Sequence, residues 1–142
     1  MREWTPQQLS AIQARNRRVL ISAAAGSGKT AVLVERVMSL LQEGIPLDRM
    51  LVMTFTHAAA NEMKERLAEQ LSAAAAADPG LKKQYALLQR ADIGTLHSFC
   101  QKIIRRHFQA AGTDPMSKLA DEALADEMLR EAMDAALDAF YT

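Results

Sequence analysis

The segment Ala23 to Thr30 places the strongest constraint on how this chain can fold. It reads Ala-Ala-Ala-Gly-Ser-Gly-Lys-Thr, which matches the phosphate-binding pattern Gly-x-x-x-x-Gly-Lys-Ser/Thr except that alanine stands at the first position. A short apolar run at residues 18–22 precedes it, and apolar residues at helical spacing follow from Lys29. The sequence therefore predicts a buried strand, a glycine-rich loop and a helix whose N-terminus faces a bound phosphate.

The residue types in this loop indicate how it would hold a nucleotide. Gly26 and Gly28 let the backbone approach phosphate oxygens closely, because neither carries a Cβ. Lys29 is expected to neutralise the β and γ phosphates of ATP, and Thr30 to offer its hydroxyl to Mg²⁺. An ordinary turn before a helix is the alternative, but the Gly-Lys-Thr triplet after a strand favours phosphate binding. The predicted nucleotide-binding residues of the loop are Ala23, Ala24, Ala25, Gly26, Ser27, Gly28, Lys29 and Thr30, and the predicted catalytic residues are Lys29 and Thr30.

The strand and helix pattern recurs along the chain. Residues 50–55 form a second apolar run, followed by a helix whose apolar face is Ala59, Met63, Leu67 and Leu71. A short helix is expected over residues 81–90, and residues 92–96 form a weaker strand candidate. The helix after that strand has an apolar face of Cys100, Ile104 and Phe108, so we expect the Cys100 thiol to be buried. This alternation predicts an α/β fold built on a parallel sheet.

The C-terminal part of the chain differs from the rest. Residues 111–115 have the composition of a linker, and an amphipathic helix with an apolar stripe at helical spacing follows them. Residues 1–116 hold 15 Lys and Arg against 10 Asp and Glu, whereas residues 117–142 hold 2 against 7. The acidic face is expected to be solvated, and the domain boundary is expected between residues 111 and 112.

Composition excludes several classes of protein. The 142 residues are 49% hydrophobic and 24% charged, which is typical of a globular domain and not of a disordered chain. A single cysteine excludes an internal disulfide, and the N-terminus has no apolar signal segment. No apolar run approaches the roughly 20 residues that a membrane-spanning helix requires. We therefore expect a cytoplasmic location and no membrane segment.

Four sequence motifs in order resemble the start of UvrD/Rep-like superfamily I helicases. They are the run from Trp4 to Ile12, then AAAGSGKTAVLVER, then LVMTFTHAAANEMKERL, then GTLHSFC. Within the family, the spelling is most similar to the A subunits of bacterial AddAB helicase-nucleases. The resemblance implies that residues 1–111 belong to a RecA-like P-loop motor domain and residues 112–142 to the start of a helical insert. Phosphate loops of this family commonly open with alanine.

The resemblance also implies roles for single residues. Gln8 would be the glutamine that reads adenine, since its amide can both donate and accept hydrogen bonds; on its own it would be taken for a solvated helix residue. The predicted DNA-binding residues are Thr54, Phe55, Thr56, His57, Thr95 and His97. Phe55 would stack on a base or, equally, end the core face of its strand. His57 departs from the asparagine that is usual in the family, and His97 is as compatible with a structural role.

The resemblance implies that the function is ATP-dependent translocation on single-stranded DNA in double-strand break repair. No apolar strand ending in an acidic pair and no arginine finger is identifiable, so we expect a fragment of a longer helicase-nuclease. The expected partners are DNA, single-stranded and duplex, and a second, AddB-like subunit. With three expected strands, an open sheet edge would favour self-association. A complete small P-loop nucleotide or metabolite kinase and a non-catalytic nucleic-acid-binding module are the alternatives, which the motif order and the presence of both Lys29 and Thr30 disfavour.

Overall fold

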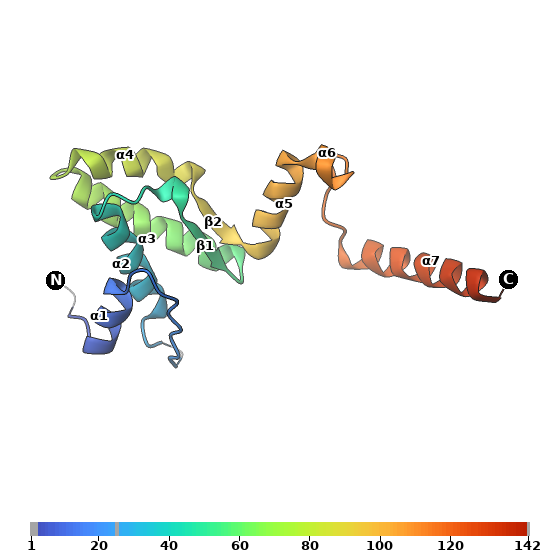
Figure 1. Cartoon of the computed structure of the whole chain (residues 1–142), viewed down its shortest axis with the longest axis horizontal. Helices are drawn as coiled ribbons and strands as arrows, with labels where there is room; N and C mark the ends of the chain where they lie inside the picture. The colour runs from blue at the N-terminus through green and yellow to red at the C-terminus, as the bar shows by residue number, and fades with distance from the viewer. Residues whose placement is uncertain (1–2, 25, 142) are drawn as a thin grey trace. The chain divides into compact units, whose positions relative to one another are not determined.

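The computed structural model describes residues 3–24 and 26–141 (Figure 1). The chain forms two compact units, Met1–Cys100 and Gln101–Thr142. The elements, in chain order, are α1 (Pro6–Gln13), α2 (Lys29–Gln42), η1 (Leu47–Arg49), β1 (Leu51–Thr54), α3 (His57–Ala75), α4 (Pro79–Leu87), η2 (Leu88–Arg90), β2 (Asp92–Thr95), α5 (Leu96–Arg106), α6 (Phe108–Ala111) and α7 (Glu122–Tyr141).

The sheet consists of β1 and β2, which pair in parallel. Leu51 is opposite Asp92 at one end of the pair, and Thr54 is opposite Thr95 at the other. Helices α3 and α4 connect the two strands, as a parallel connection requires, and α3 packs against both strands. The α/β class and the two later strands predicted from the sequence are therefore confirmed.

The prediction of a buried strand at residues 18–22 is wrong for this structure. These residues form no strand, and Val19, Leu20 and Ile21 are exposed. A strand is stable only when another strand satisfies its backbone N–H and C=O groups. Among the described residues the sheet contains β1 and β2 alone, so this apolar run has no strand beside it.

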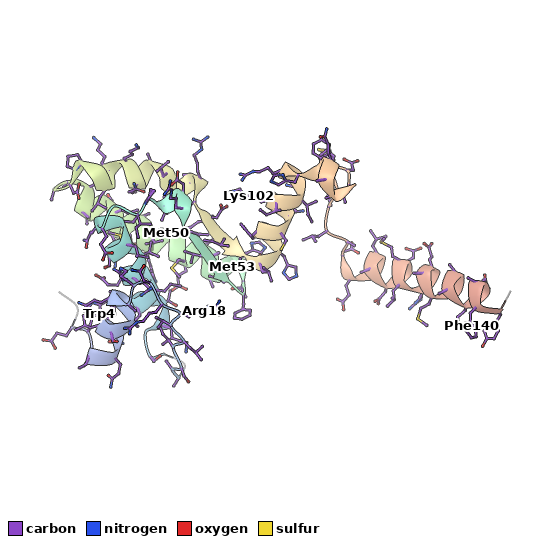
Figure 2. All side chains as sticks on the ribbon, viewed as in Figure 1. Trp4, Arg18, Met50, Met53, Lys102 and Phe140 are labelled. Carbon is purple, nitrogen blue, oxygen red and sulfur yellow. The ribbon has the colours of Figure 1, made fainter. Side chains whose placement is uncertain are left out.

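The main core lies between the sheet and helices α2, α3 and α4. Leu47, Leu67 and Leu71 are completely buried in it, and Met50, which Figure 2 labels, packs against its side. The remaining buried members are Val34, Val37, Met38, Leu41, Val52, Met63, Leu81, Leu88, Ala91 and Ile93. Three of the four residues predicted for the apolar face of α3 are buried, and Ala60 replaces Ala59 as the fourth.

Helix α1 packs on α2 through a second, smaller core. Ala11 and Ile12 of α1 contact Val32 of α2, and Trp4 covers them (Figure 2). Thr5 begins the helix with a capping box: its hydroxyl accepts from the Gln8 backbone N–H, and the Gln8 side chain accepts from the Thr5 backbone N–H. This small core places α1 beside the helix that follows the phosphate loop.

The second unit contains the C-terminal part of α5 together with α6 and α7. Helix α7 confirms the predicted amphipathic helix, and all of its described residues are exposed. Cys100, at the end of the first unit, is also exposed, which contradicts the expected burial. Spacing in a sequence shows which helix face is apolar, whereas burial depends on another element covering that face. No helix among the described residues is long and apolar enough to cross a membrane.

Candidate nucleotide and nucleic-acid site

The segment predicted to be the phosphate loop contains two glycines in the left-handed region. Gly26 has φ 76° and Gly28 has φ 84°, a backbone region in which a Cβ would meet the following carbonyl. The Ser27 backbone N–H donates to the Ala24 carbonyl oxygen at 3.3 Å, which closes the turn. Ala25, one of the predicted binding residues, lies outside the described residues. The two glycines therefore set the path of the loop into α2.

The N-terminus of α2 offers backbone donors to a ligand. Its N-cap is Gly28, and no described side chain caps it. By contrast, the N-caps of α1, α3 and α4 are Thr5, Thr56 and Asp78, whose side chains each accept a backbone hydrogen bond. The first N–H groups of a helix need an acceptor, and a phosphate is a suitable acceptor at the positive end of the helix dipole.

Lys29 is held against the loop itself. Its Nζ donates to the carbonyl oxygens of Ala23 at 2.7 Å and Ala24 at 2.8 Å. The side chain is exposed, and the adjacent Thr30 is partly buried. If a phosphate bound in the loop, the Lys29 ammonium group would exchange its two carbonyl contacts for a charge-assisted contact to the phosphate.

Gln8 contacts the loop directly. Its Nε2 donates to the Ser27 carbonyl oxygen at 3.3 Å, while its Oε1 accepts from the Thr5 backbone N–H at 2.9 Å. An amide has a second N–H and a second lone pair, so each end can make one more hydrogen bond. The structure therefore brings together Gln8 and the loop, which lie 19 positions apart in the sequence.

A cavity of about 860 Å³ lies beside this contact, between α1, residues 17–23 and the loop. Its lining includes Thr5, Gln8, Ser22, Ser27 and Lys29. Small-molecule sites commonly enclose roughly 300 to 1,000 Å³. The cavity thus has the size and the polar groups that a nucleotide requires, and both Gln8 and Lys29 line it.

Alanine variants of two glycines with the same φ angle distinguish an effect of backbone strain from an effect on ligand binding. Gly28 and Gly44 both have φ 84°, so replacing either by alanine should destabilise the chain by about 1 to 2 kcal/mol. Gly44 follows α2 at its far end, and nothing lies within 4 Å of an added Cβ there. We expect Gly28→Ala alone to weaken Mg-ATP binding in a calorimetric titration. Equal nucleotide affinities in the two variants would contradict the assignment of the loop.

The predicted nucleic-acid residues meet where the two strands end. Thr54 and Thr95 are paired at the carboxyl ends of β1 and β2; α5 begins directly after Thr95, and α3 begins after the two-residue turn of Phe55 and Thr56. Ligands of parallel sheets bind at this edge. His57 and His97 lie in the first turns of these helices and are both exposed. The structure therefore brings the two predicted motifs to one edge.

Phe55 lies in the turn after β1 and is 104% exposed. The reading of Phe55 as the last core residue of its strand is therefore wrong for this structure. The residue directly follows Thr54, where the chain leaves the sheet, and the core residues of β1 end at Val52. An exposed aromatic ring at this edge is available for stacking.

The threonine hydroxyls in these turns differ in whether their hydrogen is available to donate to a ligand. The Thr54 hydroxyl donates to the Thr56 carbonyl oxygen at 2.9 Å. The buried Thr95 hydroxyl donates to Ser98 Oγ and accepts from the Ser98 backbone N–H, both at 3.2 Å. The exposed Thr56 hydroxyl accepts from the Ala59 backbone N–H at 3.1 Å, and its own hydrogen remains available for a phosphate oxygen.

An arginine anchor at the C-terminal end of α1 was not foreseen from the sequence. Arg15 and Glu43 form a bidentate ion pair, with N–O distances of 2.6 and 2.8 Å. The hydrogen bond with Arg15 lowers the pKa of Glu43, and the same bond raises the pKa of Arg15. The partners lie 28 positions apart, and no local pattern connects residues at such a separation. The capping box of Thr5 and Gln8 was not predicted either, although its pattern Thr-x-x-Gln is local.

Comparison with known proteins places nearly the whole chain in one family. The model of the UvrD/REP helicase N-terminal domain matches residues 4–140. Similar proteins, each named as the A subunit of an ATP-dependent helicase/nuclease, include those of Moorella thermoacetica, 48% identical over 96% of this chain, and Heliobacterium modesticaldum, 44% identical over 98%. The chain spans about a tenth of the length of these relatives, 10% in each case.

This match and the four sequence motifs agree. The phosphate loop, Gln8 and the two strand-end turns all lie within the matched residues 4–140. The chain belongs to the UvrD/REP helicase family, as part of its N-terminal domain.

Proposed function

We propose that this chain is the ATP-binding segment of an ATP-dependent DNA helicase and nuclease acting in double-strand break repair and recombination. In the whole protein, ATP hydrolysis would drive translocation on single-stranded DNA. The observation that carries the proposal is the contact of Gln8 with Ser27 in a phosphate loop at an uncapped helix N-terminus. The name of the relatives, ATP-dependent helicase/nuclease, supports the same activity.

The proposed cofactors are ATP and Mg²⁺. Lys29 would contact the β and γ phosphates, and Thr30 would supply a hydroxyl ligand to Mg²⁺. Gln8 has one donor and one acceptor position left for the adenine edge. We further propose that β1 and β2 belong to the parallel sheet of a RecA-like P-loop domain, formed by residues 1–111, and that residues 112–142 begin a helical insert. The parallel register of the two strands supports this assignment.

The proposed DNA path follows the carboxyl edge of β1 and β2. Thr54, Phe55, Thr56 and His57 would line it from one turn, and Thr95 and His97 from the other. Phe55 supplies a stacking surface, and Thr56 supplies a hydroxyl donor. Thr95 would act by shaping its turn, since its hydroxyl is committed to Ser98. Such contacts to backbone and ring faces are independent of base sequence.

Phe55→Ala tests this path. We expect single-stranded oligonucleotide binding to weaken by about 1 to 3 kcal/mol, because the variant removes one stacking surface. Thermal stability should change little, since the ring is fully exposed. Tyr85→Ala is the matched control, because Tyr85 is also an exposed aromatic residue and lies on α4. Fluorescence anisotropy would measure both variants, and equal losses in the two would remove Phe55 from the path.

The proposed partners are single-stranded and duplex DNA and a second, AddB-like subunit of the whole protein. The relatives are named as one subunit of a helicase/nuclease, which supports a multi-chain assembly. The proposed location is cytoplasmic.

Self-association of this chain is a further proposal from the sheet. Each of the two strands has an edge without a strand partner among the described residues, and Leu51 and Met53 of β1 are exposed. Unpaired edges favour pairing with another chain. Sedimentation at micromolar concentration is expected to show a dimer or larger species, and a clean monomer would contradict this.

A further inference from the structure

Helix α1 ends with carbonyl groups that two arginines satisfy. The helix has 8 residues, and the last carbonyls of any helix lack partners within it. Arg36 donates through Nη1 to the carbonyl oxygens of Ala11 and Ile12. Arg15 donates through Nη1 to those of Ile12 at 2.7 Å and Ala14 at 3.0 Å. Positive charge at this end also interacts favourably with the helix dipole.

Both guanidinium groups are fixed to α2. Arg36 is a residue of α2 itself, in its second turn, and is partly buried. Arg15 is held by Glu43, the C-cap of α2, and donates to the Ser39 hydroxyl at 2.6 Å. The C-terminal end of α1 is therefore tied to the same helix whose first residue is Lys29.

The other end of α1 meets the phosphate loop. Gln8 lies in the first turn of α1 and donates to the Ser27 carbonyl oxygen at 3.3 Å. A helix of this length is roughly 12 Å long and stiff, so fixing one end determines where the other end lies. Loss of the arginine contacts would let α1 pivot about the Ile12 and Val32 packing and would misplace the Gln8 amide.

We infer that Arg36 is a positioning residue for the base end of the nucleotide site, holding α1 on α2 so that Gln8 is aligned beside the loop. The inference rests on the proposed function, and it adds a determinant of base selectivity that touches neither base nor phosphate. Arg15 and Glu43 assist by anchoring the same end of α1. The phosphate end of the site is formed by α2 and its loop, and does not depend on this anchor.

The test separates base recognition from phosphate binding. Calorimetry would measure the affinities of the full chain for Mg-ATP, Mg-GTP and inorganic tripolyphosphate with Mg²⁺. We expect Arg36→Ala to weaken Mg-ATP binding by about tenfold, the loss of one or two neutral hydrogen bonds between the Gln8 amide and adenine, and to bring it close to that of Mg-GTP. Tripolyphosphate affinity should stay unchanged. Arg36→Lys, which keeps one donor for Ala11, should recover part of the preference for ATP.

Arg49→Ala is the control, because Arg49 is an exposed arginine on η1. If circular dichroism shows that Arg36→Ala is unfolded, Glu43→Gln is used in its place. This substitution is on an exposed side chain and weakens the ion pair that holds Arg15. An unchanged ATP to GTP ratio would overturn the inference. So would a parallel loss of tripolyphosphate binding, which would indicate general destabilisation. A wild-type chain that binds neither nucleotide nor tripolyphosphate would instead overturn the proposed function.

Discussion

Lys29→Ala is expected to weaken Mg-ATP binding by about 10- to 100-fold, because it removes a charge-assisted contact to the phosphates. In the present structure, the Lys29 Nζ donates to the Ala23 and Ala24 carbonyl oxygens. Both carbonyls belong to exposed residues, so water can replace the ammonium group. We therefore expect the melting temperature to change little while affinity falls, and calorimetric titration with Mg-ATP measures the difference.

Lys83→Ala is the matched control for this prediction. Lys83 is an exposed lysine on α4, so its loss removes the same charge from the chain without touching the loop. An affinity loss shared by both variants would indicate a general electrostatic effect on a polyanion. Undiminished binding in Lys29→Ala would contradict the assignment of the phosphate loop and, with it, the proposed function.

Leu67→Ala is expected to lower the free energy of unfolding by about 2 to 5 kcal/mol. Leu67 is 0% exposed, on the face of α3 that packs into the main core with Val37, Met63 and Leu71. Truncation removes buried apolar surface and leaves a cavity among neighbours that belong to several elements. Urea titration followed by circular dichroism measures the change.

Leu119→Ala is the control for the core, because Leu119 is 66% exposed in the segment before α7. Its substitution should change the free energy of unfolding by no more than about 0.5 kcal/mol. A loss as large as that of Leu67→Ala would place Leu119 in a packed environment. A small effect of Leu67→Ala would mean that the core around α3 is not the one described.

Local patterns were enough to predict most of the elements. The apolar runs of β1 and β2 and the helical spacing of α2, α3 and α7 were each read correctly, because these periods reflect the backbone geometry of a single element. The Gly-Lys-Thr triplet located the start of α2. The apolar face of α3 was predicted to within one residue, Ala60 for Ala59.

The local sequence could not predict which strands pair or which side chains are buried by other elements. The apolar run at residues 18–22 has strand composition, but a strand exists only with a neighbour, and neither β1 nor β2 pairs with it. Whether Cys100 and Phe55 are buried could not be predicted for the same reason. Their local patterns allowed burial, and the packing of the described chain leaves both exposed.

The sequence by itself determined the family, the strands β1 and β2 and the helices α2, α3 and α7, because these depend on residue types at fixed local spacing. Only the tertiary structure decided which of these residues meet. It set Gln8 against Ser27, Thr54 beside Thr95, and Arg36 under the end of α1. The physical reason is that each of these contacts joins segments about 20 or more positions apart, whose approach is fixed by the packing of whole helices and strands.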